Sequence, residues 1–365
     1  MEGKAENPGA AVAVVIPSLN PDGKLSEYVA ALRSLANWPI VIVDDGSDAA
    51  HAANFRSCMA IPGVTLLRHD VNKGKGRALK TAFTHLLEAA PELAGCVTCD
   101  SDGQHLPKDV MRCADALRSN PGALVLGCRT FGLDHVPFRS RFGNNTIRAF
   151  FALATGRRFS DTQTGLRAIP AGFMRELLGV AGERFDFETR MLLALGARPL
   201  VEVPIETVYL DGNKSSHFNP LRDSSRILGI VCAEIASRLW RFAAASLASF
   251  ALDISLFAAL HTWVFAELPR GRLALSVVLA RVLSATFNYL ANLRLVFGGG
   301  KSRHAPLKYA ALAVALMAAS YLLTKAALGM SPHAQAHVKA TKALVDFLLF
   351  LASFGVQRLL VFSRR

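Results

Sequence analysis

Short apolar runs alternate with amphipathic stretches through the first two hundred residues of the chain. The apolar runs have the length and composition of buried strands, and they lie at residues 11–16, 39–43, 64–67, 95–99, 123–129 and 199–203. Between them, apolar residues recur at helical spacing at 25–35, 77–88, 107–117, 139–155 and 188–195. This alternation predicts an α/β fold, in which a mostly parallel sheet is covered by helices on both faces.

The pattern changes at about residue 239, after which the chain is nearly all Ala, Leu, Val and Phe with short basic loops. Four stretches reach the ~20 apolar residues that cross a bilayer, at 239–265, 273–297, 307–328 and 343–362. The second and fourth end in similar sequences, NLRLVF at 292–297 and QRLLVF at 357–362, as two hairpins of similar design would. The sequence therefore predicts an all-α four-helix transmembrane domain after the α/β domain.

Polar residues within the predicted spans mark places where a membrane helix needs a partner. Asp253, Arg281, Asn288 and Asp346 lie there, and such groups are costly in lipid unless they face one another or a cavity. Basic residues follow the second and fourth spans, which places those ends on the cytosolic side by the positive-inside rule.

Composition and charge agree with an integral protein of the cell inner or plasma membrane. The 365 residues are 52% hydrophobic, with a mean hydropathy of +0.30. The net charge of +13 suits cytosolic loops facing anionic lipid, and no nucleic-acid-binding module is visible, so we expect no nucleic acid partner. We expect a disordered tail without a signal peptide (1–10), a cytoplasmic catalytic domain (11–218), a linking interfacial helix (219–238) and the transmembrane domain (239–365). A homo-oligomer stays an open alternative.

Two of the six cysteines, Cys96 and Cys99, have the C-x-x-C spacing of redox and zinc sites. They lie on a predicted strand, however, and no second Cys or His pair follows at zinc spacing. We interpret them as buried thiols in a reducing compartment.

The most informative polar turn follows the predicted strand at 95–99. In it, Asp100 and Asp102 precede Gly103, and Gln104 follows it. Two carboxylates at the carboxyl end of a strand suit a hard cation such as Mg²⁺ or Mn²⁺ that also binds a substrate diphosphate. An ordinary Asp-rich turn is the alternative. The stretch is not an EF-hand loop, because Met111 stands where that loop needs its final Glu.

Other polar residues follow other strands, and parallel strands bring their carboxyl ends to one edge of the sheet. Asn20, Asp44 and Asp45 would therefore gather near the first pair, where the two aspartates suit hydrogen bonds to a base and ribose or, alternatively, an Asx turn. Residues 72–76, with Lys75, do not fit the Walker P-loop, but Gly and Lys at a helix N-terminus still suit phosphate or sugar contact.

Two later clusters are candidates for the acceptor side. Asp186 lies between aromatic residues and is our candidate general base, which a hydroxyl acceptor would need. The hydroxyl-rich basic stretch before the membrane part suits an anionic phosphate. Its candidate phosphate-binding residues are Lys214, Ser215, Ser216, His217 and Arg222.

Four motifs occur in order, VVIPSLN (14–20), VIVDDGS (41–47), NKGKG (72–76) and DSDGQH (100–105). Over residues 11–225 the chain thereby resembles the family-2 glycosyltransferases of GT-A fold, nearest to dolichyl- and polyprenyl-phosphate sugar synthases. Ser18 and Leu19 stand where that family more often has Thr-Tyr, and the Q-x-x-R-W motif of processive polysaccharide synthases is absent. The membrane half resembles the GtrA family of four-span proteins through residues 287–289, Asn292, Arg294 and 296–297.

These resemblances imply a metal-dependent transfer of a hexose from a UDP- or GDP-sugar to a polyprenyl phosphate at the cytosolic membrane face, for cell-envelope or glycan assembly. They imply a metal on Asp100, Asp102 and Gln104, with Asp102 and Arg222 taking part in catalysis. The implied contacts to the nucleotide sugar are Pro17, Asn20, Asp44, Asp45, Lys75, Asp100 and Arg129. The membrane domain would anchor the enzyme and help to translocate the lipid-linked sugar. The alternatives are transfer to a hydroxyl acceptor and a non-catalytic transport or anchoring protein.

Overall fold

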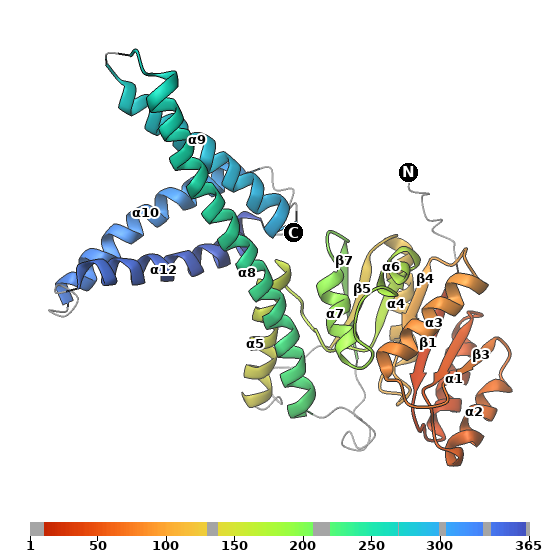
Figure 1. Cartoon of the computed structure of the whole chain (residues 1–365). Helices are drawn as coiled ribbons and strands as arrows, with labels where there is room; N and C mark the ends of the chain where they lie inside the picture. Colours follow the sequence, from red (N-terminus) through yellow and green to blue (C-terminus); the bar gives the residue numbers. More distant parts are fainter. Residues whose placement is uncertain are drawn as a thin grey trace. The chain divides into compact units, whose positions relative to one another are not determined.

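The computed structural model describes residues 11–129, 138–206, 220–268, 270–298, 304–330 and 337–362. The chain divides into two compact units. The first contains residues 1–149 and 159–231, and the second contains residues 150–158 and 232–365. A short piece of the N-terminal half, residues 150–158, thus groups with the C-terminal helices. Both units can be followed in Figure 1.

A seven-stranded sheet forms the centre of the first unit, in the order β3-β2-β1-β4-β6-β5-β7. Its strands are β1 (Val12–Ser18), β2 (Ile40–Asp44), β3 (Val64–Arg68), β4 (Gly95–Thr98), β5 (Leu124–Arg129), β6 (Arg167–Pro170) and β7 (Leu200–Ile205). All pairs are parallel except those of β6, which runs antiparallel to both β4 and β5. The predicted α/β fold with a mostly parallel sheet is confirmed.

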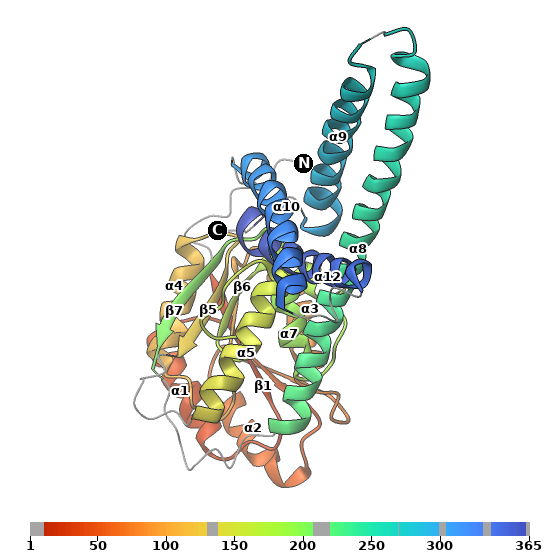
Figure 2. The same ribbon diagram turned by 90° about the vertical axis from the view of Figure 1, so that its left-hand side faces the viewer.

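Helices cover both faces of this sheet, as the alternating pattern predicts (Figure 2). On one face, side chains of α1 (Lys24–Leu35), α2 (Ala52–Met59) and α4 (Pro107–Ser119) pack with Val12, Val14 and Ile16 of β1 in one hydrophobic core. The other face contacts α3 (Lys75–Ala89) and α6 (Ala171–Leu177), and α3 also contacts α7 (Asp186–Ala194). Because β1 is buried on both sides, it reads as a continuous apolar run.

The six predicted strands are present, and β6 is the additional one. The helices α2 and α6 are also additional, and α7 begins at Asp186 rather than at the predicted residue 188. The helix α5 (Phe138–Thr155) matches the predicted helix at 139–155. Cys96 and Cys99 are buried free thiols, as the sequence indicated.

The second unit is built from long helices. They are the part of α8 (Pro220–Ala259) after residue 231, α9 (Arg272–Ala291), α10 (Ala305–Met330) and α12 (Val338–Val356). Within the described residues, three candidate membrane spans have the necessary length and hydropathy, Ser225–Val264, Ala305–Met330 and Leu344–Val361. The predicted second span forms α9, and its crossing of the membrane stays a prediction. Helices α10 and α12 pack closely against each other (Figure 1).

The similar sequences at the ends of α9 and α12 fold in the same way and pack together. Asn292–Val296 and Gln357–Val361 are π-helical turns, closed by N–H bonds from Phe297 and Phe362 to the carbonyls five residues earlier. The rings of Phe297 and Phe362 stack with centroids 4.9 Å apart. The sequence repeat is therefore also a structural repeat.

Arg358 connects this part of the unit to residues 150–158. Its side chain is only 1% exposed and donates to the carbonyls of Ala154 (2.7 Å), Leu153 (3.3 Å) and Phe297 (3.3 Å). A cation at the last carbonyls of a helix is favourable, and here it satisfies the C-terminal end of α5.

Candidate active site

The carboxyl ends of β1, β2 and β4 lie next to one another, because these three strands are parallel neighbours in the sheet. Ser18 at the end of β1 pairs with Asp44 at the end of β2, and β4 leads directly into Asp100. The structure thus brings the turns that carry Asn20, Asp45 and Asp100 to one edge of the sheet. The sequence predicted this gathering.

Asp44 and Asp45 are buried and hold the surrounding loops by hydrogen bonds. Asp44 accepts the backbone N–H of Ser47, and Asp45 accepts those of Lys73 and Gly74 at 2.9 and 2.7 Å. His69 lies 2.7 Å from Asp45. Asp44 therefore closes the turn at 44–47, Asp45 fixes the loop before α3, and their contacts to a base and ribose stay a prediction.

Asn20 joins the first two loops of this edge. It adopts the left-handed backbone region at φ 50°, donates its own N–H to the hydroxyl of Ser47, and exchanges two hydrogen bonds with Asp48. An Asn in this conformation is one of the few non-glycine residues that accept it readily. Asn20 thus stabilises the sheet edge, and Pro17 lies within β1 just before it.

Two glycines let the start of α3 approach the segment before α7. A Cβ on Gly74, which has φ 100°, would lie 2.5 Å from the carbonyl oxygen of Glu183, and a Cβ on Gly76 would lie 2.5 Å from Phe187. The glycines of the NKGKG motif are therefore required by close packing. This contact sets Lys75, at the first turn of α3, beside α7.

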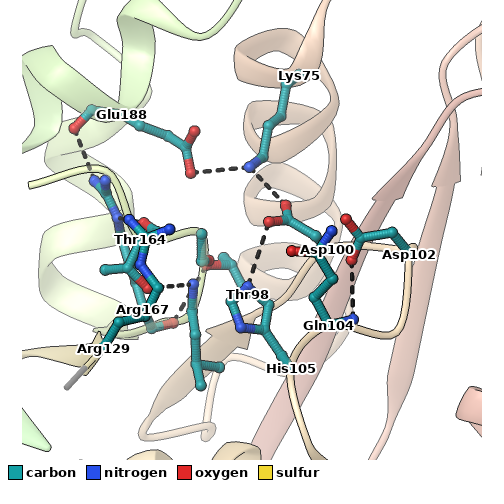
Figure 3. Close-up of polar contacts among 12 residues, drawn as sticks. Lys75, Thr98, Asp100, Asp102, Gln104, His105, Arg129, Thr164, Arg167 and Glu188 are labelled. Carbon is teal, nitrogen blue, oxygen red and sulfur yellow. Dashed lines mark hydrogen bonds and ion pairs between the residues drawn. The ribbon is translucent and has the colours of Figure 1, made fainter. Parts of the chain in front are cut away.

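Lys75 bridges two carboxylates that come from distant parts of the chain (Figure 3). Its ammonium lies 2.7 Å from Oδ1 of Asp100 and 3.1 Å from Oε1 of Glu188. His105 contacts the other oxygen of Asp100 at 3.3 Å. Sequence reasoning included Lys75 and Asp100 in the donor site but did not single out Glu188 or His105.

The loop before β6 forms the wall behind Asp100. The hydroxyl of Thr98 donates to the carbonyl of Gly165 at 2.9 Å, which holds this loop against β4. A Cβ on Gly165 would lie 2.4 Å from Oδ2 of Asp100. The Asp100 carboxylate can therefore occupy this position only because residue 165 is a glycine.

Burial and charge act on these groups in opposite directions. Burial alone would raise the pKa of Asp100, but Lys75 and His105 hold that pKa well below its usual range. Burial alone would lower the pKa of Lys75, but the carboxylates of Asp100 and Glu188 raise it above its usual value. Asp100 and Lys75 are therefore both charged near neutral pH.

Asp102 is in a different electrostatic position. Burial, followed by the negative charge of Asp100, raises the pKa of Asp102 above its usual value. Its Oδ1 accepts the backbone N–H of Gln104 at 3.1 Å. Two carboxylates this close in sequence repel each other, and a divalent cation would relieve the repulsion. The donor set of Asp100, Asp102 and Gln104 thus fits a hard metal ion that keeps several ligands from water or phosphate.

No group of three or more His, Cys, Asp or Glu side chains gathers as a metal site within the described ranges. A magnesium-type site does not need one, since Mg²⁺ binds through one or two carboxylates and substrate phosphates. The choice of metal ligands therefore stays a prediction.

Arg129, expected near the donor phosphates, forms a two-point ion pair with Asp161 (2.6 and 3.1 Å). These contacts lower the pKa of Asp161 although its burial acts the other way. The nearby Arg167 is fully buried, and it donates to the carbonyls of Glu188 (2.7 Å) and Thr164 (2.9 Å). These arginines tie the loop at 161–167 to β5 and α7.

The side chains of Asp186 and Glu188 contact different residues. Asp186 accepts the backbone N–H of Arg184 and lies 3.6 Å from Arg190 and 4.0 Å from Arg226. Glu188, two residues later on α7, contacts Lys75 instead. Residues i and i+2 lie on nearly opposite faces of a helix, so only one of the two can face Asp100 through Lys75. The structure brings Glu188 to this position, whereas the sequence pattern singled out Asp186.

The expected acceptor-phosphate residues Lys214, Ser215, Ser216 and His217 lie outside the described residues. Arg222 lies in the first turn of α8, and its side chain is likewise outside what the structure describes.

Two known families match the two parts of the chain. Glycosyl transferase family 2 matches residues 13–178, and the GtrA/DPMS transmembrane domain matches residues 241–362. The first match contains the site residues from Pro17 to Arg167, whereas Asp186, Glu188 and the basic segment at 214–222 lie beyond it. The two matched ranges agree with the change in hydrophobic pattern at about residue 239.

Curated relatives resemble the first part. One is the UDP-N-acetylglucosamine–dolichyl-phosphate N-acetylglucosaminyltransferase of Methanococcus voltae, 26% identical over 217 residues, which cover 54% of this chain and 86% of the relative. Another is the dolichyl-phosphate beta-glucosyltransferase of Saccharomyces cerevisiae, 27% identical over 233 residues, with 56% and 68% covered.

Among solved structures, one similar chain is glucosyl-3-phosphoglycerate synthase from Mycobacterium tuberculosis in complex with Mn²⁺, uridine diphosphate and phosphoglyceric acid. It is 17% identical with a TM-score of 0.47, and the alignment covers 63% of this chain and 80% of that one.

Proposed function

Because the chain joins a glycosyl transferase family 2 domain to a GtrA/DPMS transmembrane domain, we propose that it transfers a hexose from a UDP- or GDP-sugar to a polyprenyl phosphate. The enzyme is a glycosyltransferase of the polyprenyl-phosphate sugar transferase type. We place the reaction at the cytosolic face of the membrane.

The observation that carries the proposal is the charged group at the sheet edge, Asp100, Asp102 and Lys75, in a chain with membrane helices. Carboxylates at the carboxyl end of parallel strands lie where ligands bind in α/β sheets. Because the same chain carries a GtrA/DPMS transmembrane domain, an acceptor embedded in the bilayer is a suitable substrate.

Asp100, Asp102 and Gln104 would hold the Mg²⁺ or Mn²⁺ ion. When bound, the metal neutralises charge on the leaving diphosphate. Lys75 keeps Asp100 ionised and fixed, and Glu188 holds Lys75 from the other side. Asp45 orients the loop from which Lys75 projects, through the N–H groups of the two preceding residues.

A phosphate acceptor is already ionised near neutral pH, so it needs position rather than a general base. We assign that positioning to the basic segment with Lys214, Ser215, Ser216, His217 and Arg222, whose hydroxyl and cationic groups suit a phosphate. For a hydroxyl acceptor a base would be needed, and Asp186, which lies beside two arginines, and Glu188 would be its candidates.

The test supplies a short polyprenyl phosphate and the corresponding polyprenol separately, each with a panel of labelled UDP- and GDP-hexoses. We expect the full-length enzyme in detergent to glycosylate only the phosphate. Transfer to the alcohol alone would refute the lipid-phosphate acceptor.

Asp102→Asn tests the metal assignment, with Asp115→Asn as a matched control on the exposed surface of α4. We expect Asp102→Asn to lose at least ~100-fold in kcat and to bind Mn²⁺ more weakly, while its Tm stays near that of the wild type. Wild-type Mn²⁺ affinity in this variant would contradict the assignment, independently of activity.

A further inference from the structure

The second unit contains a cavity of about 360 Å³ between its long helices. This is within the size range of pockets for small molecules. One wall is a single face of α10, at positions 309, 312, 313, 316, 317 and 320. The facing wall is a single face of α12, at 346, 349, 350 and 353, continued by Gln357 at the start of the π-helical turn. Phe242 and Ser246 of α8 and Asn288 of α9 complete it.

Polar groups line this cavity although it lies within helices of membrane-spanning composition. They are Ser246, Asn288, Ser320, Asp346, Ser353 and Gln357. Ser320 and Asp346 form a hydrogen bond of 2.6 Å across the two walls. Polar groups at membrane depth are costly and usually serve a ligand or a pathway.

A second observation concerns the polar network at one end of the cavity. Asn292 is fully buried, and its amide N–H donates to Asn288 (3.1 Å) and Gln357 (3.4 Å), both of which line the cavity. The amide oxygen of Asn292 has no hydrogen-bond partner among the described residues. A buried acceptor without a partner is unfavourable, so this oxygen is suited to accept a hydrogen bond from a ligand.

The lining chemistry selects the ligand class. No Lys or Arg is among the described residues that line the cavity, so the lining offers no cationic partner to an anionic phosphate. Hydroxyl, amide and carboxylate groups match the hydroxyls of a sugar, and Phe242, Tyr309 and Phe350 offer the aromatic surface on which a sugar ring packs.

We propose that this cavity binds an uncharged glycosyl group inside the membrane domain, with Asp346 as an acceptor for its hydroxyls. Asp346 and Ser353 are seven residues apart on α12, so the polar lining extends ~10 Å along the helix. The glycosyl group of the enzyme's lipid product is the source we assign, and this assignment alone rests on the proposed function.

The experiment measures protection of an introduced thiol in the full-length protein in lipid nanodiscs. Ala313→Cys places a thiol on the α10 wall, and Val314→Cys, which is exposed and outside the lining, is the matched control. N-ethylmaleimide labelling is quantified by peptide mass spectrometry, so native cysteines are read separately. The probes are octyl glucoside, octyl mannoside, octyl phosphate and octyl tri(ethylene glycol).

We expect an octyl glycoside to slow labelling of the Ala313→Cys thiol several-fold and to leave the Val314→Cys thiol unchanged. Adding Asp346→Asn should raise the half-protecting concentration roughly 10-fold, because a neutral amide oxygen is a weaker hydrogen-bond acceptor than a carboxylate. Asp253→Asn is the control, since that carboxylate pairs with Arg281 outside the cavity. Equal protection by octyl phosphate or the glycol ether, or no effect of Asp346→Asn, would overturn the site.

A separate arm tests the source of the sugar. Adding donor nucleotide sugar and polyprenyl phosphate together should protect the thiol only after turnover. If the glycosides protect and turnover product does not, the assignment to the product is wrong while the glycosyl site stands. If no transfer occurs at all, the proposed function fails, and the glycoside arm still decides whether the cavity binds a sugar.

Discussion

Gly165→Ala is the sharpest single test of how the site is built, because it acts on Asp100 by contact alone. The added Cβ would lie 2.4 Å from Oδ2 of Asp100 and 2.8 Å from its Cγ and Oδ1, whereas ordinary contacts begin at 3.4 Å. Rotating the carboxylate does not remove the overlap, since all three atoms are close. Gly165 is not among the glycines with positive φ, so alanine brings no backbone strain of that kind.

The carboxylate must therefore move by about 1 Å, and a displacement of that size at a reacting centre costs on the order of 100-fold in rate. The loop cannot easily retreat, because Thr98 holds the carbonyl of Gly165 and β6 pairs with β4.

The assay is kcat for transfer to a polyprenyl phosphate, together with Mn²⁺ affinity and Tm. Gly172→Ala is the control, because a Cβ there meets nothing within 4 Å. We expect Gly165→Ala to lose about 100-fold in kcat and to bind Mn²⁺ more weakly, and Gly172→Ala to behave as wild type. Unchanged kcat and Mn²⁺ affinity in Gly165→Ala would refute the placement of Asp100 in the catalytic site.

Two further substitutions test the buried charges. Lys75→Met removes the cation that keeps the pKa of Asp100 low, so burial raises that pKa and the acid limb of the kcat–pH profile moves to higher pH. The control Lys73→Met changes an exposed lysine and should leave the acid limb in place. The same acid limb in both variants would contradict the ion pair between Lys75 and Asp100. Arg358→Met leaves buried carbonyls without a donor, and each unpaired carbonyl costs ~1–3 kcal/mol of folding stability. The Tm of this variant in detergent should therefore fall clearly below that of the control Arg241→Met, which changes an exposed arginine. Equal Tm values in the two variants would be the contrary result.

The sequence predicts the strands and the gathering of polar turns because both follow from local signals. Apolar runs such as β1 and β2 end in Asn, Asp or Gly, and parallel pairing then brings their ends together without further information. The antiparallel strand β6 has no such signal. It has only four residues, begins with the buried Arg167 and ends with Pro170, so neither alternation nor an apolar run marks it.

The choice between Asp186 and Glu188 could not be predicted for a different reason. Both lie in the first turn of α7, and only the rotation of that helix decides which one faces Lys75. That rotation depends on Gly74 and Gly76, which pack against residues 183–187 from more than a hundred positions away. Long-range packing of this kind leaves no periodic pattern in the sequence.

The contact between Arg358 and the end of α5 also constrains the order of events during synthesis. Ala154 leaves the ribosome 204 residues before the arginine that satisfies its carbonyl. At ~5–20 residues per second, this interval is about 10 to 40 s. During that time the whole helical part, α8 to α12, is made and must enter the membrane, so the C-terminal end of α5 completes its packing among the last steps of biogenesis.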